Sequence, residues 1–179
     1  MQMTSSSGDR NFDVAFEELL VHEGGFVDHP NDPGGATKYG ISLRWFRSAV
    51  SSAATVASIK ALTPEKARAL YHDHWWKRYK YDQLPEAIAR KVFDTSVNMG
   101  AKRAHRLLQR AVWGACGKHN KIKDDGIIGP RTLKAVRNCD QGRLLASFRS
   151  EQAAYYRILI AKRPKFKVFE LGWLRRAYA

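Results

Sequence analysis

The sequence predicts a mainly α-helical protein with one small β-hairpin near the N-terminus and a helical C-terminal part. Apolar residues recur three and four positions apart through most of the 179 residues, which is typical of amphipathic helices. Turn-forming residues gather at 31–35, between two short apolar runs, and this favours a hairpin or an irregular loop. No run approaches the ~20 apolar residues that a membrane-spanning helix needs.

The expected helices can be followed along the chain from their periodicity and their ends. The first covers residues 12–22, where Phe12 and Phe16 share a face, and two glycines end it. A short helix begins at Ser42, and a later one starts with Thr63 as its N-cap and a proline in the first helical position. The helix that starts at Thr63 runs to about residue 77, and further helices are expected over residues 86–99, 101–115 and 142–161. Short helices are expected from residue 130 onward and over residues 166–178.

The positive charge of the chain lies in its second half. Residues 1–99 carry 12 Lys and Arg against 12 Asp and Glu, whereas residues 100–179 carry 19 against 5 and supply the whole net charge of +14. Such a basic half is expected to be attracted to a polyanion, such as nucleic acid, anionic lipid head groups or a charged cell envelope. A solvated basic face that only keeps the protein in solution is the alternative.

We expect three segments along the chain. Residues 1–11 form a flexible polar leader, residues 12–100 a first folded part, and residues 101–179 a basic helical part that packs on the first. Helices on both sides of residue 100 are apolar enough to share a core. The leader lacks the apolar stretch of a secretory signal peptide, which predicts synthesis in the cytoplasm without such a signal.

The cysteines and acidic turns do not indicate a metal site. Cys116 and Cys139 are too few for a disulfide scaffold and form no metal motif, so we expect two idle or buried thiols. Asp124 and Asp125 supply too few oxygen ligands for a calcium loop. We therefore expect no metal and no cofactor.

Two carboxylates and a hydroxyl are the strongest candidates for chemistry. Glu23 follows the first expected helix, Asp32 lies nine positions on in the turn segment, and Thr37 lies five further on. Glycosidic hydrolysis uses one protonated acid for the leaving oxygen and one carboxylate that holds water or stabilises an oxocarbenium ion. Burial beside the apolar helix and the negative helix end would raise the pKa of Glu23. Asp32 would stay ionised in its polar turn, where capping of the turn is an equal alternative.

Several runs of residues are shared with one known family. They occur at residues 20–26 (LVHEGGF), 31–41 (NDPGGATKYGI), 93–94 (FD), 97–100 (VNMG), 108–111 (LQRA), 125–133 (DGIIGPRTL) and 172–176 (GWLRR). Together they resemble glycoside hydrolase family 108, which comprises lysozyme-like N-acetylmuramidases of phage endolysins and related bacterial proteins. The run at 125–133 resembles the predicted peptidoglycan-binding region that is often joined to this family.

The resemblance implies a lysozyme-like α+β fold and roles for individual residues. It makes residues 12–100 the catalytic part, residues 101–179 the peptidoglycan-binding part, and Glu23 the catalytic general acid. The order Glu23, Asp32, Thr37 is similar to that of phage lysozymes, where the aspartate and the threonine position a water and the product anomer inverts. This chain has one residue fewer between Asp32 and Thr37 than that pattern usually has.

Further residues are candidate sugar contacts. Tyr39 and Trp76 are candidates because their rings could stack on a sugar, although aromatic residues at helical spacing also pack in cores. Asn98 shares a helix face with Asp94, so it either contacts sugar or helps Asp94 to brace the active-site loop. The same choice between sugar and core applies to Trp45 and Trp75.

The leading hypothesis is hydrolysis of the β-1,4 bond between N-acetylmuramic acid and N-acetylglucosamine in peptidoglycan, by a phage endolysin that lyses the host cell. Alternatives are a secreted antibacterial muramidase effector, a lytic transglycosylase, a wall-binding protein with a dead site, and a basic nucleic-acid-binding module. The last does not explain the glycines around Glu23, so no dedicated nucleic-acid partner is expected. The expected partners are bacterial peptidoglycan and the anionic envelope. We expect a monomer that acts in the periplasm or cell wall after release by a holin or a secretion system.

Overall fold

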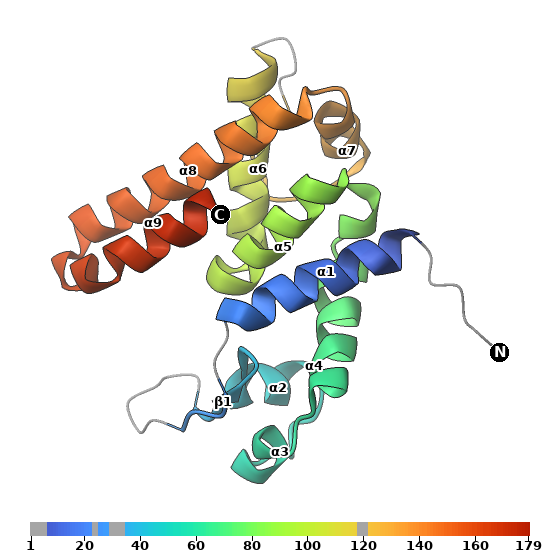
Figure 1. Cartoon of the computed structure of the whole chain (residues 1–179), viewed down its shortest axis with the longest axis vertical. Coiled ribbons are helices and arrows are strands. Elements are labelled where there is room, and N and C mark those ends of the chain that lie inside the picture. The colour runs from blue at the N-terminus through green and yellow to red at the C-terminus, as the bar shows by residue number, and fades with distance from the viewer. Residues whose placement is uncertain (1–6, 23–24, 29–34, 118–121) are drawn as a thin grey trace. The chain divides into compact units, whose positions relative to one another are not determined.

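The computed structural model describes residues 7–22, 25–28, 35–117 and 122–179, which are mainly helical, as the sequence predicts (Figure 1). The chain divides into two compact units, Met1–Tyr79 and Lys80–Ala179, called here the N-terminal and C-terminal units. The division lies before the helix over residues 86–99, whereas the sequence places a boundary at residue 100. None of the described helices is long and apolar enough to cross a membrane.

The N-terminal unit consists of short helices around the predicted small hairpin. Its elements are α1 (Ser7–His22), β1 (Thr37–Lys38), β2 (Ile41–Ser42), α2 (Leu43–Ala49), α3 (Val56–Lys60), α4 (Pro64–Tyr71) and the π-helix η1 (His72–Lys77). The predicted N-cap Thr63 is confirmed, because its hydroxyl accepts the N–H of Lys66 at the start of α4. Ser42, at the predicted start of a short helix, caps α2 in the same way. Helix α1 starts at Ser7 rather than at the predicted Phe12. The sequence did not indicate the earlier start because residues 7–11 are polar and show no apolar periodicity.

Aromatic side chains form the core of the N-terminal unit. The ring of Phe12 lies 6.0 Å from that of Phe16 and 5.4 Å from that of Trp76, centroid to centroid. Phe16 in turn lies 5.9 Å from Tyr71. These contacts pack α1 against α4 and η1, and the rings of Phe12, Tyr71 and Trp76 are fully buried.

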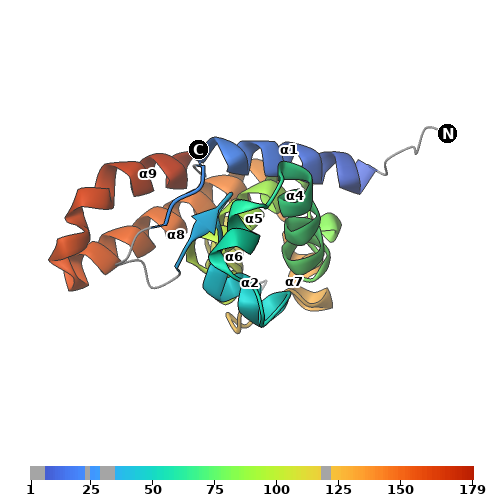
Figure 2. The same ribbon diagram turned by 90° about the horizontal axis from the view of Figure 1, so that it is seen from below.

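The described elements of the C-terminal unit are all helical, and a loop precedes α7. It contains the 3-10 turn η2 (Tyr81–Gln83) and the helices α5 (Glu86–Met99), α6 (Ala101–Cys116), α7 (Pro130–Arg137) and α8 (Gln141–Lys162), followed by the 3-10 segment η3 (Pro164–Phe169) and α9 (Glu170–Tyr178). Helix α6 packs against α5 and α8, and α9 runs back along α8 (Figures 1 and 2). The largest buried apolar side chains here include Ile88, Leu108 and Phe148.

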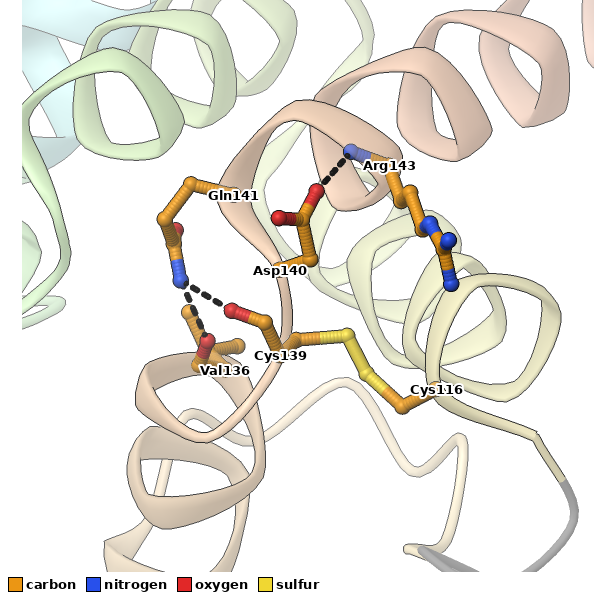
Figure 3. The surroundings of a disulfide bond; sticks show 6 residues. All are labelled: Cys116, Val136, Cys139, Asp140, Gln141 and Arg143. Carbon is orange, nitrogen blue, oxygen red and sulfur yellow. Dashed lines mark hydrogen bonds between the residues drawn. A yellow bond between two sulfur atoms is a disulfide. The ribbon is translucent and has the colours of Figure 1, made fainter.

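The two cysteines form a disulfide, so the expectation of idle thiols is wrong. Cys116 is the last residue of α6, and Cys139 lies between α7 and α8, with 5.6 Å between their Cα atoms (Figure 3). Beside it, Asp140 caps α8 by accepting the N–H of Arg143, and Gln141 donates to the carbonyl of Cys139 at 2.7 Å. The pairing escaped the sequence because cysteines 23 residues apart carry no local pattern.

Candidate functional site

The hairpin of the N-terminal unit is built around a two-residue turn. Its strands pair antiparallel, with Thr37 opposite Ser42, and Tyr39 and Gly40 connect them with φ of 52° and 74°. Positive φ at both turn residues is the geometry that matches the twist of the strands in a tight hairpin. The hydroxyl of Tyr71 donates to the backbone carbonyl of Tyr39 at 2.9 Å and so ties the turn to α4.

Thr37 joins the hairpin to a third extended segment. Its N–H donates to the carbonyl of Val27 at 2.7 Å, and the N–H of Val27 donates to the carbonyl of Thr37 at 2.8 Å. The hydroxyl of Thr37 donates to the carbonyl of Gly35 at 3.1 Å. Because the hydroxyl proton is directed into that bond, the oxygen is oriented to accept a hydrogen bond from another group, such as a water.

Glu23 and Asp32 lie outside the described residues, but the structure defines the elements that flank them. Helix α1 ends at His22, so Glu23 is the next residue of the chain. The bridge between Val27 and Thr37 closes the base of the segment to which Asp32 belongs. The predicted carboxylates therefore fall in one stretch of the N-terminal unit that is anchored by α1 on one side and by the hairpin on the other.

A partly exposed aromatic group lies beside the hairpin in the same unit. The indole of Trp45, from α2, lies 4.7 Å from that of Trp75, from η1, and the ring of His74 meets Trp45 edge-on at 5.3 Å. Tyr71, which holds the hairpin turn, lies 5.0 Å from Trp75. This arrangement depends on the π-helix η1, a form of helix that is frequent at functional sites.

The two aromatic residues predicted to contact sugar have different surroundings. Tyr39 is half-buried in the hairpin turn, with the ammonium of Lys38 5.3 Å from its ring centroid. Trp76 is 0% exposed and packs against Phe12, so its ring belongs to the core of the N-terminal unit. A fully buried ring offers no face to a sugar, and we therefore remove Trp76 from the candidate contacts.

Asn98 and Asp94 lie on α5 in the C-terminal unit, where both engage the α8–α9 pair. A carboxylate oxygen of Asp94 accepts from the guanidinium of Arg176 at 2.8 Å. The side-chain oxygen of Asn98 accepts from the hydroxyl of Tyr156 at 2.6 Å. These residues brace α5 against α8 and α9, and Asn98 is otherwise exposed.

Gln109 holds the loop that precedes α7. Its amide nitrogen donates to Asp125 Oδ1 at 2.9 Å and to the carbonyl of Ile127 at 3.1 Å, and its oxygen accepts the N–H of Gly126 at 2.8 Å. Gly126 has φ of 82°, and a Cβ there would lie 2.8 Å from the carbonyl oxygen of Lys102. Within the run at residues 125–133, these contacts account for the Asp125–Gly126 turn, which Gln109 holds from α6.

His105 fixes the same loop from α6. One ring nitrogen, Nδ1, lies 2.9 Å from the carbonyl of Gly126, and the other, Nε2, lies 2.8 Å from the hydroxyl of Tyr81. A carbonyl only accepts, so Nδ1 carries the proton and Nε2 accepts from Tyr81. Burial lowers the pKa of His105, against the opposing effect of the hydrogen bond to Gly126. The ring is therefore neutral in the folded protein near pH 7.

A cleft of about 500 Å³ opens beside this loop. Its lining includes the apolar side chains of Ile122, Ile127 and Pro130, together with the cations Lys123 and Arg131. The disulfide between α6 and the end of α7 brackets the same loop in sequence. The cleft thus offers a ligand apolar surface and two cations, beside the carboxylate of Asp125, which Gln109 holds.

The charge difference between the two units follows the structural division closely. The N-terminal unit holds 9 Lys and Arg against 9 Asp and Glu, and the C-terminal unit holds 22 against 8, a net charge of +14. A long-range attraction to anions therefore belongs to the C-terminal unit alone.

The sequence missed three features of these sites. They are the disulfide, the clamp made by Gln109, and the close pairing of Trp45 with Trp75. Of these three, only the contacts of Gln109 could have been sought in the sequence. A glycine after Asp124 and Asp125 indicates a tight turn, and the polar groups of such a turn need hydrogen-bond partners.

Comparison with known proteins assigns a family model to each half of the chain. Residues 16–100 match the model described as glycosyl hydrolase 108, and residues 103–178 match that described as a predicted peptidoglycan domain. Among solved structures, SagA of Brucella abortus is 31% identical, and the match covers 94% of this chain and 90% of that chain with a TM-score of 0.78. No curated protein matches the chain significantly.

Proposed function

The chain belongs to the glycosyl hydrolase 108 family, as a glycoside hydrolase of peptidoglycan with a C-terminal peptidoglycan domain, and from this premise we propose that it is an N-acetylmuramidase. Its bond would be the β-1,4 link between N-acetylmuramic acid and N-acetylglucosamine. The observation that carries the proposal is the position of Glu23, immediately after α1 ends at His22 and inside the matched residues 16–100.

In the proposed mechanism, Glu23 is the general acid that protonates the leaving oxygen. The negative end of the α1 dipole would disfavour a carboxylate next to the helix end, and so would favour the protonated form that a general acid needs. Asp32 and Thr37 would hold the attacking water. The hydroxyl of Thr37 already donates to the carbonyl of Gly35, so its oxygen can accept a hydrogen bond from one O–H of that water. Asp32 would accept a hydrogen bond from the other O–H and take its proton as the water attacks. Attack from the side opposite the leaving group would invert the anomer.

Sugar binding is proposed for the exposed aromatic residues of the N-terminal unit. Tyr39 and the Trp45–Trp75 pair offer partly exposed ring faces near the hairpin that carries Thr37. The apolar C–H face of a sugar ring can pack on such rings, which have a large apolar area and little conformational freedom to lose. Asn98 is kept as a possible polar contact because its amide nitrogen is not the atom that meets Tyr156.

Analysis of the reaction products tests the proposal. Mass spectrometry of digested peptidoglycan should show fragments with reducing muramic acid ends, because water is the acceptor. Fragments with anhydro-muramic ends would instead identify a lytic transglycosylase. Reducing glucosamine ends would mean that the enzyme cleaves the other glycosidic bond, and would also overturn the proposal.

Wall binding is proposed for the cleft of the C-terminal unit. Peptidoglycan carries free carboxylates on its stem peptides, which suit Lys123 and Arg131, and methyl groups that suit Ile127. Exchange of both cations for glutamate should weaken the sedimentation of the protein with purified sacculi. Unchanged sedimentation of this variant would place the wall-binding surface elsewhere.

We also propose that the protein acts as a phage endolysin, released to the wall from the cytoplasm of the host. Two observations support this proposal. The chain belongs to a family that includes phage endolysins, as the sequence resemblance implies, and its C-terminal unit carries a positive charge suited to the anionic envelope. Expression in a bacterial host should cause lysis only when a holin is also produced. Lysis of neighbouring cells after contact-dependent delivery, without lysis of the producer, would instead favour a secreted antibacterial effector.

A further inference from the structure

The end of the α8–α9 pair carries an apolar surface that the fold does not use. Helix α8 ends at Lys162, the chain turns through η3 (Pro164–Phe169), and α9 returns along α8 (Figures 1 and 2). The connecting segment and the first turn of α9, residues 162–171, are called here the hairpin tip. In the views of both figures, the tip lies at the end of this helical pair.

The hairpin tip has its own aromatic core on the inner side. The ring of Trp173 lies 5.0 Å from Tyr156, 5.8 Å from Phe166 and 5.5 Å from Phe169. Ala153 and Ala177 are buried in the same cluster. Val168 and Leu171 are not part of this aromatic cluster, whereas Phe169 packs on it with one part of its ring and is exposed with the other.

Large apolar side chains face outward from the tip. Val168 is 80% exposed, Leu171 is 64% exposed and Phe169 is 50% exposed. Val168 and Leu171 are three positions apart, and Tyr178 follows seven positions later, so these residues fall along one side of η3 and α9. Ile158, near the end of α8, is also exposed. An apolar group of this size on an exposed turn indicates an interaction surface.

Positive charge surrounds this apolar group. Lys162, Arg163, Lys165 and Lys167 are all exposed and lie within six residues. Two of them flank the ring of Phe166, with the guanidinium of Arg163 6.0 Å and the ammonium of Lys165 5.6 Å from its centroid. The tip contains a single acidic residue, Glu170, which is half-buried. Charge and apolar surface therefore occur together on the same short segment.

We infer that the hairpin tip binds the surface of an anionic phospholipid bilayer. Exposed aliphatic side chains such as Val168 and Leu171, at the end of a projecting helical pair, can enter the region between head groups and acyl chains. Aromatic residues such as Phe169 favour the same boundary, and lysines around them attract anionic head groups. The tip would hold the enzyme against the membrane that borders the peptidoglycan layer. This activity does not depend on the proposed bond specificity.

Vesicle binding by the full-length protein tests the inference. Co-flotation should be strong with vesicles of phosphatidylethanolamine and phosphatidylglycerol and weak with vesicles of phosphatidylcholine alone. Val168→Ser with Leu171→Ser should lower binding to the anionic vesicles roughly 10-fold or more, and so should Lys165→Glu with Lys167→Glu. All four residues are exposed, so the variants should keep the melting temperature of the parent protein.

Matched controls separate the tip from the charge and apolar content of the whole chain. Val50→Ser with Val56→Ser removes two exposed aliphatic side chains outside the tip, and Lys134→Glu with Arg143→Glu makes the same change in net charge. Both control variants should bind anionic vesicles as the parent does, and the tip variants should still sediment with sacculi and cleave soluble glycan fragments.

Three results would overturn the inference. One is equal binding of the parent protein to neutral and anionic vesicles. Another is a failure of the tip variants to differ from their references: both bind vesicles as the parent does, or the control variants lose as much vesicle binding as the tip variants. The third is a loss of sacculus binding by the tip variants while vesicle binding persists, which would make the tip a wall-binding surface. A failure of the proposed muramidase activity would leave the vesicle-binding and sacculus-binding measurements unaffected.

Discussion

The two units differ in net charge and in the interactions that hold their loops in place. The N-terminal unit has balanced charge and supports its candidate site with a few short-range hydrogen bonds around the hairpin, such as that from Tyr71 to Tyr39. The C-terminal unit carries the whole net charge of +14 and fixes its loop with a disulfide and the buried side chain of Gln109. Proton transfer needs local geometry, whereas attraction to a polyanionic envelope needs only accumulated charge on a stable support. The separation allows each unit to change without loss of the other's role.

The largest effect should come from Glu23 in the N-terminal unit. Glu23→Gln removes the proposed general acid and should lower the rate of peptidoglycan cleavage about 10²–10⁴-fold, with sacculus binding unchanged. Turbidity loss of a sacculus suspension measures the rate. Glu18→Gln is the matched control, because Glu18 is an exposed carboxylate on α1. Substantial cleavage by a folded Glu23→Gln protein would remove Glu23 from the mechanism.

The disulfide should matter to the stability of the C-terminal unit. Cys116→Ser with Cys139→Ser opens a loop of 23 residues and should lower the free energy of unfolding by about 3 kcal/mol. Urea unfolding followed by circular dichroism measures the change. Reduced wild-type protein should behave like the double variant, while cleavage of soluble fragments under native conditions should persist. Equal stability of oxidised and reduced protein would show that Gln109 and the helix packing hold the loop without the bridge.

Thr37 should affect turnover more than binding. Thr37→Ala should lower kcat roughly 10-fold to 100-fold with little change in KM, because the oxygen that would hold the water is lost. Thr37→Ser keeps that oxygen and should restore most of the rate. If both variants turn over equally slowly, the methyl group and its strand packing matter rather than the hydroxyl. The corresponding Asp32→Asn variant should be nearly silent only if Asp32 caps a turn.

A smaller effect is expected from pH on the C-terminal unit. Burial lowers the pKa of His105, so the folded protein takes up a proton less readily than the unfolded chain, whose histidine titrates near 6.5. The free energy of unfolding is therefore highest above that value and falls as the pH drops through it. Urea unfolding at a series of pH values should show this slope, and His105→Gln should reduce it. An unchanged slope in the variant would assign the effect to another group.

The helices could be predicted wherever a cap or an apolar stripe marks them. Thr63 and Pro64 gave the start of α4, and the stripe of α5 gave both of its ends at Glu86 and Met99. The first turn of α1 was missed because polar residues carry no periodicity. The change from α4 to a π-helix at His72 was also missed, since an extra residue in one helical turn depends on tertiary packing.

The candidate site could be predicted in outline but not in its surroundings. The spacing from Glu23 to Thr37 and the family resemblance indicated the acid. A small hairpin near the N-terminus is present as predicted, but its turn is formed by Tyr39 and Gly40 rather than by residues 31–35. The sequence could not decide which of the neighbouring indoles Trp75 and Trp76 faces the core. Both occur in one helical run, and only the packing of α1 buries Trp76.

The salt dependence of cleavage on two substrates tests the separation of roles most directly. Added salt shortens the Debye length from ~10 Å at 0.1 M to ~3 Å at 1 M, which weakens long-range attraction but leaves a local proton transfer largely intact. Cleavage of intact sacculi should therefore fall steeply with salt, mainly through binding, and cleavage of a short uncharged glycan fragment should fall much less. Equal sensitivity on both substrates would contradict the assignment of envelope attraction to the basic C-terminal unit and of chemistry to the N-terminal unit.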